Sequence, residues 1–179
     1  MPTLIRQFPI LVKRREVVVP GGTATILPFQ LAVNVSLTNN KVHVLSPNTP
    51  RFPAVIDLGF NQSFLLQERH FIDWANLQRS QFKTVGRMTV FGQETPEYTA
   101  KVWVHRNAVG THHDAPGGEP FCIQLDNGVA VSPSNLRNPR LPLLGLRTLF
   151  FGDLQLSFDW RERSSFSLLT TPWWWRFFA

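Results

Sequence analysis

The 179-residue sequence has little cysteine, little charge and no long hydrophobic run, and each shortage excludes a class of structure. A single cysteine, Cys122, excludes an internal disulfide framework and a cysteine-rich zinc site. Charged residues make up 17% of the chain, against about 25% in typical domains, so the composition is not that of a disordered charged tail. Because no run of about 18 apolar residues exists, we expect no transmembrane helix and no integral membrane association.

The start of the chain and its charge bear on location and partners. Residues 1–6 lack the long apolar core of a secretory signal, so a reducing, cytoplasmic location is the expectation. The formal net charge is +6, but the one cationic run, Lys13-Arg14-Arg15, is followed at once by Glu16 and three valines. No aromatic RNA-binding motif accompanies the scattered arginines, so we expect a solvated basic face and no nucleic-acid partner.

The residues that are abundant favour β-structure. The chain has 15 phenylalanines, and its 14 prolines and 11 glycines supply many turns. Apolar residues alternate over 29–35, which predicts a half-buried strand, and Asn39-Asn40 predicts a hairpin turn into a second strand over 41–45. Apolar residues three apart predict a short helix within 68–77.

Further turns are predicted downstream. The segments 87–91 and 98–104 flank residues 92–96, which predicts a β-hairpin with an exposed tip. Asp126-Asn127-Gly128 lies between two apolar segments and predicts another hairpin turn. A helical turn around 148–151 and a final alternating strand follow.

Asp57 is the strongest candidate for a catalytic residue. It follows the apolar strand 54–56 directly and is itself followed by Leu58 and Gly59, before a second apolar strand begins at 63. A carboxylate at the end of such a strand, with a glycine that permits a tight turn, is held rigidly near a buried surface. An Asp-x-Gly triplet by itself is weak evidence, because most such triplets are ordinary turns.

The sequence around Asp57 resembles the active-site strand of retropepsin-like aspartic proteases, in which an apolar run leads into Asp-Thr/Ser-Gly and then into another strand. About 80 residues later, Leu143-Leu144-Gly145-Leu146 is similar to the apolar-apolar-Gly motif of that family. The resemblance spans roughly residues 28–169. It implies a mostly β fold, a retropepsin-like closed β-barrel lobe with a flap hairpin and one or two short helices.

The resemblance also implies roles for particular residues. Gly92, Gln93 and Glu94 would belong to the flap that covers a bound substrate. Leu144 and Gly145 would pack beside the active-site loop.

The same resemblance divides the chain into three parts. Residues 1–27 would be N-terminal extension strands, 28–169 the retropepsin-like domain and 170–179 an aromatic C-terminal tail. The tail is too short to span a bilayer, and we expect it to be buried against the domain or at a subunit interface.

One Asp-x-Gly motif of this kind implies a homodimer, with Asp57 of each chain across a two-fold axis. Two carboxylates that close share one proton and titrate as a pair. The ionised member would activate a water and the protonated member would polarise the scissile carbonyl of a peptide or protein substrate. No metal and no organic cofactor is needed for this hydrolysis.

Leu58 departs from the family pattern, because the family has Thr or Ser at this position. The hydroxyl there makes hydrogen bonds across the dimer, which a leucine cannot make. Two functions therefore stay open: an aspartic endopeptidase, which we favour, and a catalytically degenerate dimer that binds extended peptides or serves as a scaffold.

Two other features could carry chemistry but are better explained as structure. His112-His113-Asp114 could offer metal ligands, but neighbouring residues of an extended loop point in opposite directions and no third ligand is evident. Cys122 lies between apolar residues and is more typical of a small core side chain than of a nucleophile. We expect no metal site.

Overall fold

The computed structural model describes residues 3–90, 92–125, 127–134, 140–159 and 165–171, and within these ranges the chain is mostly β, as predicted. The helical parts are one short α-helix and two short turns of other helix types. In chain order the elements are β1 (Thr3–Pro9), β2 (Arg15–Val19), β3 (Gly22–Ile26), β4 (Leu31–Asn39), β5 (Phe52–Asp57), β6 (Phe64–Gln67), the π-helical turn η1 (His70–Trp74), the 3-10 turn η2 (Arg79–Gln81), β7 (Thr84–Val90), β8 (Gln93–Tyr98), β9 (Ala100–Val104), β10 (Phe121–Gln124), β11 (Val129–Ser132), β12 (Leu143–Gly145), α1 (Leu146–Phe151), β13 (Leu154–Asp159) and β14 (Ser165–Thr170).

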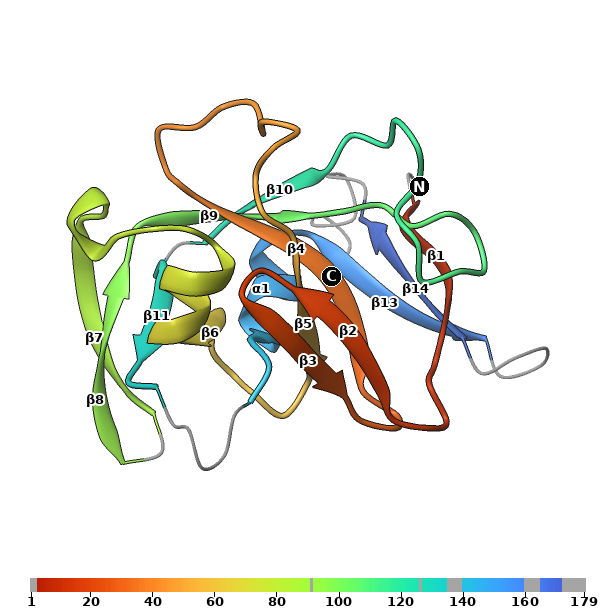
Figure 1. Ribbon diagram of the computed structural model, residues 1–179, viewed down its shortest axis with the longest axis horizontal. Coiled ribbons are helices and arrows are strands. Elements are labelled where there is room, and N and C mark those ends of the chain that lie inside the picture. Colours follow the sequence, from red (N-terminus) through yellow and green to blue (C-terminus); the bar gives the residue numbers. More distant parts are fainter. Residues whose placement is uncertain (1–2, 91, 126, 135–139, 160–164, 172–179) are drawn as a thin grey trace.

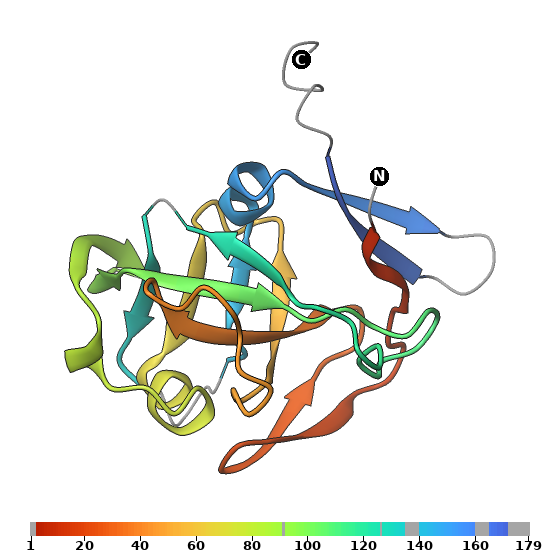
Figure 2. The same ribbon diagram turned by 90° about the horizontal axis from the view of Figure 1, so that it is seen from above.

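The main sheet has the strand order β10-β9-β4-β5-β12-β6-β11-β8-β7 (Figure 1). It contains two parallel pairs, β5 with β12 and β6 with β11, and the other neighbours are antiparallel. A second sheet, β1-β14-β13, joins the two ends of the described chain beside the main sheet (Figure 2), and β2 and β3 form a separate hairpin.

The sheet curls strongly but is not a closed barrel. β8 and β9 lie near opposite ends of the strand order, yet only Thr99 separates them in the chain. The sheet must therefore curl until these two strands meet. The continuous chain holds the sheet together at this corner, while among the described strands β10 and β7 are edge strands that do not pair with each other. The expected barrel closure by hydrogen bonds is thus wrong.

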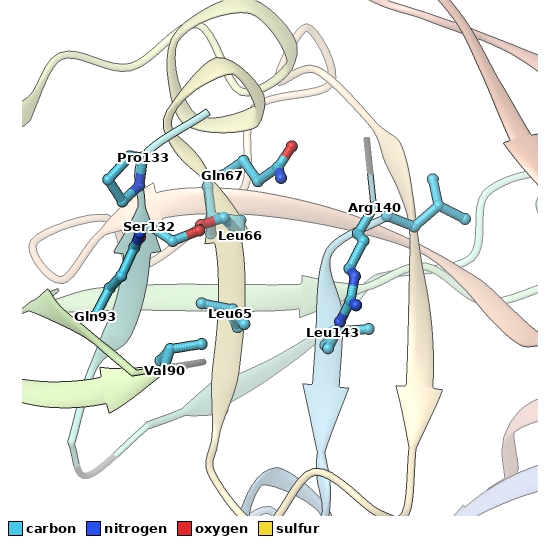
Figure 3. A pocket seen from close by; sticks show the side chains of 10 residues that line it. Leu65, Leu66, Gln67, Val90, Gln93, Ser132, Pro133, Arg140 and Leu143 are labelled. Carbon is cyan, nitrogen blue, oxygen red and sulfur yellow. The ribbon is translucent and has the colours of Figure 1, made fainter. Parts of the chain in front are cut away.

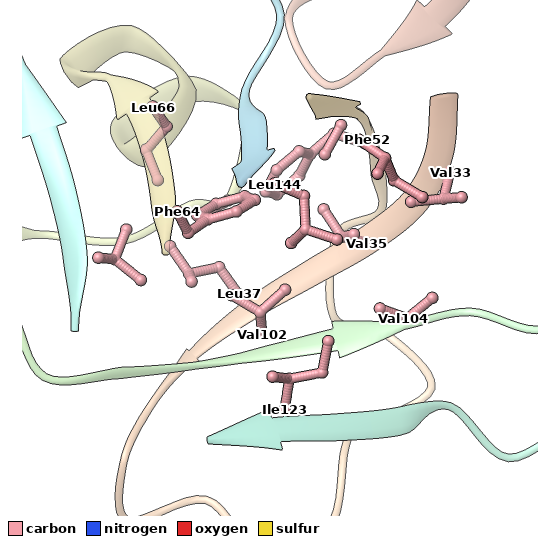
Figure 4. Close-up of a cluster of buried hydrophobic side chains, with 14 of the residues drawn as sticks. Val33, Val35, Leu37, Phe52, Phe64, Leu66, Val102, Val104, Ile123 and Leu144 are labelled. Carbon is pink, nitrogen blue, oxygen red and sulfur yellow. The ribbon is translucent and has the colours of Figure 1, made fainter. Parts of the chain in front are cut away.

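The hydrophobic core fills the inside of this curl. Figure 4 shows Val35 and Leu37 of β4, Phe64 of β6, Val102 of β9 and Leu144 of β12 pointing toward a common centre. All five are at most 1% exposed. Because they come from strands far apart in the sequence, burial of their apolar surface fixes which strands become neighbours.

Two predicted hairpins do not form. After β4 the segment 41–45 is not a strand, and β4 pairs instead with β5 and β9. Around Asp126-Asn127-Gly128, of which Asp126 lies outside the described residues, β10 and β11 diverge to different partners. Gly128 has φ +77°, and a Cβ there would lie 2.3 Å from the carbonyl oxygen of Tyr98. The glycine therefore serves a close approach to another strand as well as a turn.

The predicted helix within 68–77 is shorter than expected. It is the five-residue turn η1, which buries Phe71 and Trp74 and is followed by Asn76 in a left-handed conformation with φ +53°. A left-handed residue cannot continue a right-handed helix, which explains the early end. Within the described ranges, no helix is both long and apolar enough to cross a bilayer.

Candidate active site

Asp57 is the last residue of β5 and lies where this buried strand reaches the surface. The five residues before it, Phe52–Ile56 in the chain, are all buried, whereas Asp57 is half-buried. In the parallel pairing of β5 with β12, Gly145 is the register partner of Asp57. The two predicted motifs, about 90 residues apart, therefore meet at the same edge of the sheet.

The loop after Asp57 is organised around its carboxylate. The N–H of Gly59 donates a hydrogen bond to Asp57 Oδ1 at 2.9 Å, and the N–H of Phe60 donates to the Asp57 carbonyl oxygen at 3.2 Å. Gly59 is not in the left-handed region, so its backbone conformation does not demand glycine, contrary to the expectation from the sequence. A Cβ at Gly59 would lie 3.3 Å from Asp57 Oδ1, so the glycine instead leaves room for the carboxylate.

Gly145 allows β12 to approach the Asp57 loop closely. A Cβ at this position would lie 2.1 Å from the carbonyl oxygen of Gln62 and 2.5 Å from that of Phe60. No side chain fits in that space. Its neighbour Leu144 points to the opposite face of the strand and is fully buried in the main core. β12 is thus anchored on one face and pressed against the loop at its end.

Three hydrogen bonds fasten the loop to β12 and α1. The N–H of Gly145 donates to the carbonyl oxygen of Ser63 at 2.7 Å, and the N–H of Leu146 donates to that of Phe60 at 2.8 Å. The Thr148 hydroxyl, which is fully buried, also donates to the Ser63 carbonyl oxygen, at 2.6 Å. The loop is therefore fixed at Phe60 and at Ser63 by groups of the second motif and of the residue Thr148 just after it.

The carboxylate of Asp57 shares a face of the sheet with several apolar side chains. Side chains alternate between faces along a strand, and directly paired residues lie on the same face. Val55 is two residues before Asp57 and pairs with Leu143, which also pairs with Leu65, and Leu65 pairs in turn with Ala130. These five residues thus lie on one face, opposite to the main core.

The β7–β8 hairpin lies over this face. Val90 and Met88 of β7 pack with Leu65, Ala130 and Leu143 in a small separate hydrophobic cluster. Burial of these side chains holds the hairpin on the same side of the sheet as Asp57.

A pocket opens between this hairpin and β12 (Figure 3). Its volume is about 360 Å³, within the range of small ligand sites. Leu143, in its wall, is two residues from Gly145, the partner of Asp57. At roughly 3.3 Å per residue, the pocket therefore begins about 7 Å along the strand from the carboxylate. The residues that matter most for its chemistry are Leu65, Gln67, Val90, Gln93, Arg140 and Leu143.

The three predicted flap residues have different positions. Gly92 has φ +78° and lies in a turn, whereas Gln93 already belongs to β8 and pairs with Val90, so the exposed tip predicted over 92–96 is wrong beyond Gly92. Phe91 lies outside the described residues. Gln93 lines the pocket. Glu94 pairs with Arg87 at 3.0 Å, with both side chains more than 70% exposed, and is not among the pocket-lining residues.

Leu58 lies at the surface and is 47% exposed. Leu146, at the start of α1, is 47% exposed as well, and Phe150 and Phe151 are 74% and 38% exposed. We call these four residues the apolar surface. Because Leu146 is hydrogen-bonded to the Asp57 loop through Phe60, the apolar surface extends from that loop along α1.

Within the described ranges, no hydrogen bond or ion pair joins Asp57 to a second carboxylate, and no group of three or more His, Cys, Asp or Glu side chains could hold a metal. His112 packs edge-on against Phe8, and Asp114 accepts hydrogen bonds from Arg51 and Asn34. The thiol of Cys122 is partly buried, and this burial raises its pKa above the usual value.

Sequence reasoning missed three residues of this site. Thr148 follows Gly145 by three residues, so a threonine just after the second motif was a usable signal, and the structure shows that its hydroxyl is buried and bonded to Ser63. Val90 and Arg140 carry no motif, and only the folding of the hairpin and of the segment before β12 brings them beside Leu143.

Comparisons with known protein families, with curated proteins and with solved structures find no match for this chain.

Proposed function

We propose that this protein is a retropepsin-like aspartic endopeptidase that works as a homodimer, with Asp57 of each chain activating a water to hydrolyse peptide bonds. The observation that carries the proposal is the fixed loop of Asp57. Its carboxylate stands at the end of a buried strand, and hydrogen bonds from Gly145, Leu146 and Thr148 hold the loop around it. The β7–β8 hairpin on the same face supports the role of a substrate cover.

The proposed chemistry needs two carboxylates. The N–H of Gly59 occupies Asp57 Oδ1, and among the described residues Oδ2 has no hydrogen-bond partner, which leaves it for a water. A second Asp57 nearby would share one proton with the first, because two ionised carboxylates in contact repel each other. The ionised carboxylate then takes a proton from the water, and the protonated one donates a hydrogen bond to the peptide carbonyl.

The apolar surface supports association of two copies. Leu58 is adjacent to Asp57 in the chain and Leu146 adjoins the same loop, so a second copy packed here would bring its own Asp57 close. Full burial of a leucine or phenylalanine side chain is worth roughly 1.5–3 kcal/mol. Several such side chains from each copy give an association that a single exposed leucine would not.

Peptide cleavage by the Asp57→Asn protein tests the proposal directly. We expect a peptide library to be cleaved by the natural protein between pH 3 and pH 7 and not by Asp57→Asn, because the amide cannot take up the proton of the water. Asp73→Asn is the matched control, since Asp73 is an exposed aspartate on η1. Cleavage that survives in Asp57→Asn, or a protein that stays monomeric at tens of micromolar in sedimentation, would overturn the proposal.

A second candidate function is favoured by one observation, the exposed leucine at position 58. Without a hydroxyl there, the two loops lack a directional hydrogen bond between copies, and the dimer could bind extended peptides without cutting them. Leu58→Thr separates the two functions. Faster cleavage in Leu58→Thr supports the peptidase, whereas no cleavage in either protein, with peptide binding retained, supports the binding module.

A further inference from the structure

Lys101 of β9 is a buried cation that has no carboxylate partner among the described residues. Its side chain is only 9% exposed. The ammonium donates one hydrogen bond, to the carbonyl oxygen of Val42 at 2.7 Å, and takes part in none of the ion pairs between described residues. An ammonium has three N–H groups, so two of them remain for a ligand. Buried charges are normally paired, because removing a charge from water is costly. The described residues thus leave the charge of Lys101 uncompensated.

A pocket with a volume of about 340 Å³ opens at this lysine, away from Asp57 and its loop. Thr99 and Lys101 lie two residues apart in the chain, and Gln124 of β10 is the register partner of Lys101. Side chains alternate between faces along a strand, and directly paired residues lie on the same face. Two neighbouring strands therefore present these three side chains on one face of the sheet, and all three line the pocket.

The other polar groups of the pocket suit an anion. The segment after β4 adds Asn40 and His43 to its lining. The carboxamides of Asn40 and Gln124 and the ring of His43 can each donate a hydrogen bond. The Thr99 hydroxyl already donates to the carbonyl oxygen of Lys83, at 3.3 Å, so it is not counted among these donors. No carboxylate is among the described lining residues, and the walls that the structure describes carry a positive charge.

We propose that this pocket binds a phosphate group, either as inorganic phosphate or as part of a small phosphate monoester, with the ammonium of Lys101 as the main charged contact. A lysine ammonium is a compact point charge that binds phosphate well. Phosphate also has more acceptor oxygens than a carboxylate, so it can use donors that come from two strands and a loop. The proposal does not depend on the peptidase, because Asp57 is not among the lining residues.

Calorimetric titration at constant ionic strength tests the site directly. Inorganic phosphate, phenyl phosphate and acetate are titrated separately into the natural protein near neutral pH. We expect the phosphates to bind about tenfold more tightly than acetate. The tighter of the two phosphates shows whether the pocket takes the free ion or a monoester. Lys101→Gln keeps a donor for the Val42 carbonyl but removes the charge, and should weaken phosphate binding by about tenfold.

Matched variants separate the pocket from the general positive charge of the chain. Lys13→Met removes the charge of an exposed lysine outside the pocket and should leave phosphate binding unchanged. Lys101→Arg keeps the charge and should bind phosphate more tightly than Lys101→Gln does. His43→Ala and Gln124→Ala change exposed lining residues, so they test the site even if the Lys101 variants fail to fold in circular dichroism. Each should weaken phosphate binding, but by less than Lys101→Gln.

Cys122, the single cysteine of the chain, reports where the anion binds. Burial raises the pKa of its thiol, and the charge of Lys101 acts in the opposite direction. A phosphate on Lys101 should cancel part of that opposing effect and slow the alkylation of Cys122 by iodoacetamide, because the thiolate is the reacting form. We expect no such slowing in Lys101→Gln.

Three results would overturn the inference. The first is phosphate binding that is equally tight in the natural protein and in folded Lys101→Gln. The second is acetate that binds as tightly as phosphate. The third is alkylation that phosphate slows equally in both proteins, since the anion would then act from another place.

Discussion

Replacing Gly145 by alanine tests whether the second motif supports the Asp57 loop. Gly145 has φ −86° and ψ 174°, an extended conformation that alanine adopts without strain. The cost must therefore come from the added methyl group, which would lie 2.1 Å from the Gln62 carbonyl oxygen. Because real Cβ contacts essentially never fall below 3.0 Å, the loop would have to move by about 0.9 Å.

That movement has two energetic consequences. Forcing an extra methyl group into a packed site costs about 1–3 kcal/mol. The same shift weakens the hydrogen bonds from Gly145 to Ser63 and from Leu146 to Phe60, each worth about 1 kcal/mol. We expect Gly145→Ala to lower the free energy of unfolding by more than 1 and up to about 5 kcal/mol, measured by urea denaturation, and to abolish any cleavage because the loop carries Asp57.

Gly86→Ala is the matched control for this experiment. Gly86 also lies in a strand, but the atom that an added Cβ would meet there, at 2.8 Å, is Oε2 of Glu97, the end of a flexible side chain that can swing away. We expect a change of less than about 1 kcal/mol there. A Gly145→Ala protein as stable and as active as Gly86→Ala would refute the close approach of β12 to the loop.

Two further predictions concern buried polar groups. Burial, helped by the neighbouring Arg69, lowers the pKa of His70 from 6.5 to about 3. The stability that neutral His70 contributes is therefore complete above pH 6.5 and is lost as the pH falls toward 3, by about 2 kcal/mol at pH 5. Between pH 7 and pH 5, urea denaturation should show a smaller loss of unfolding free energy in His70→Gln than in the natural protein, and an equal loss would contradict this. Thr148→Val removes the hydroxyl bonded to Ser63 and should cost about 1–2 kcal/mol in the same assay, whereas Thr148→Ser, which keeps the hydroxyl, should cost less than Thr148→Val.

The acid sensitivity of His70 also affects the cleavage assay. A carboxylate pair favours acidic conditions, but the protein loses stability over the same range because the unfolded chain binds a proton that buried His70 does not. His105, whose pKa burial lowers to about 4, acts in the same direction. Loss of cleavage below pH 5 should therefore be compared with circular dichroism before it is assigned to Asp57.

The local features of this protein follow from neighbouring residues of the chain. The run of apolar residues that ends at Asp57 predicts a buried strand with a carboxylate at its tip, because both properties belong to neighbouring residues. The mostly β composition and the short helix after Gly145 follow in the same way from local pattern. The turn signal at 39–40 failed, since β4 pairs on one edge with β5 and on the other with β9, which leaves no edge of β4 for the segment 41–45.

Which of these strands and loops become neighbours depends on packing between distant parts of the chain. The parallel pairing of β5 with β12 joins residues about 90 positions apart, and register between such distant strands is set by burial of their shared core and not by any local signal. The same packing places Arg140 and Val90 in one pocket and lets the Thr148 hydroxyl reach the Ser63 carbonyl. It also leaves the curled sheet open, because β8 and β9 meet through the continuous chain and the hydrogen-bonding groups of β7 and β10 are never brought side by side.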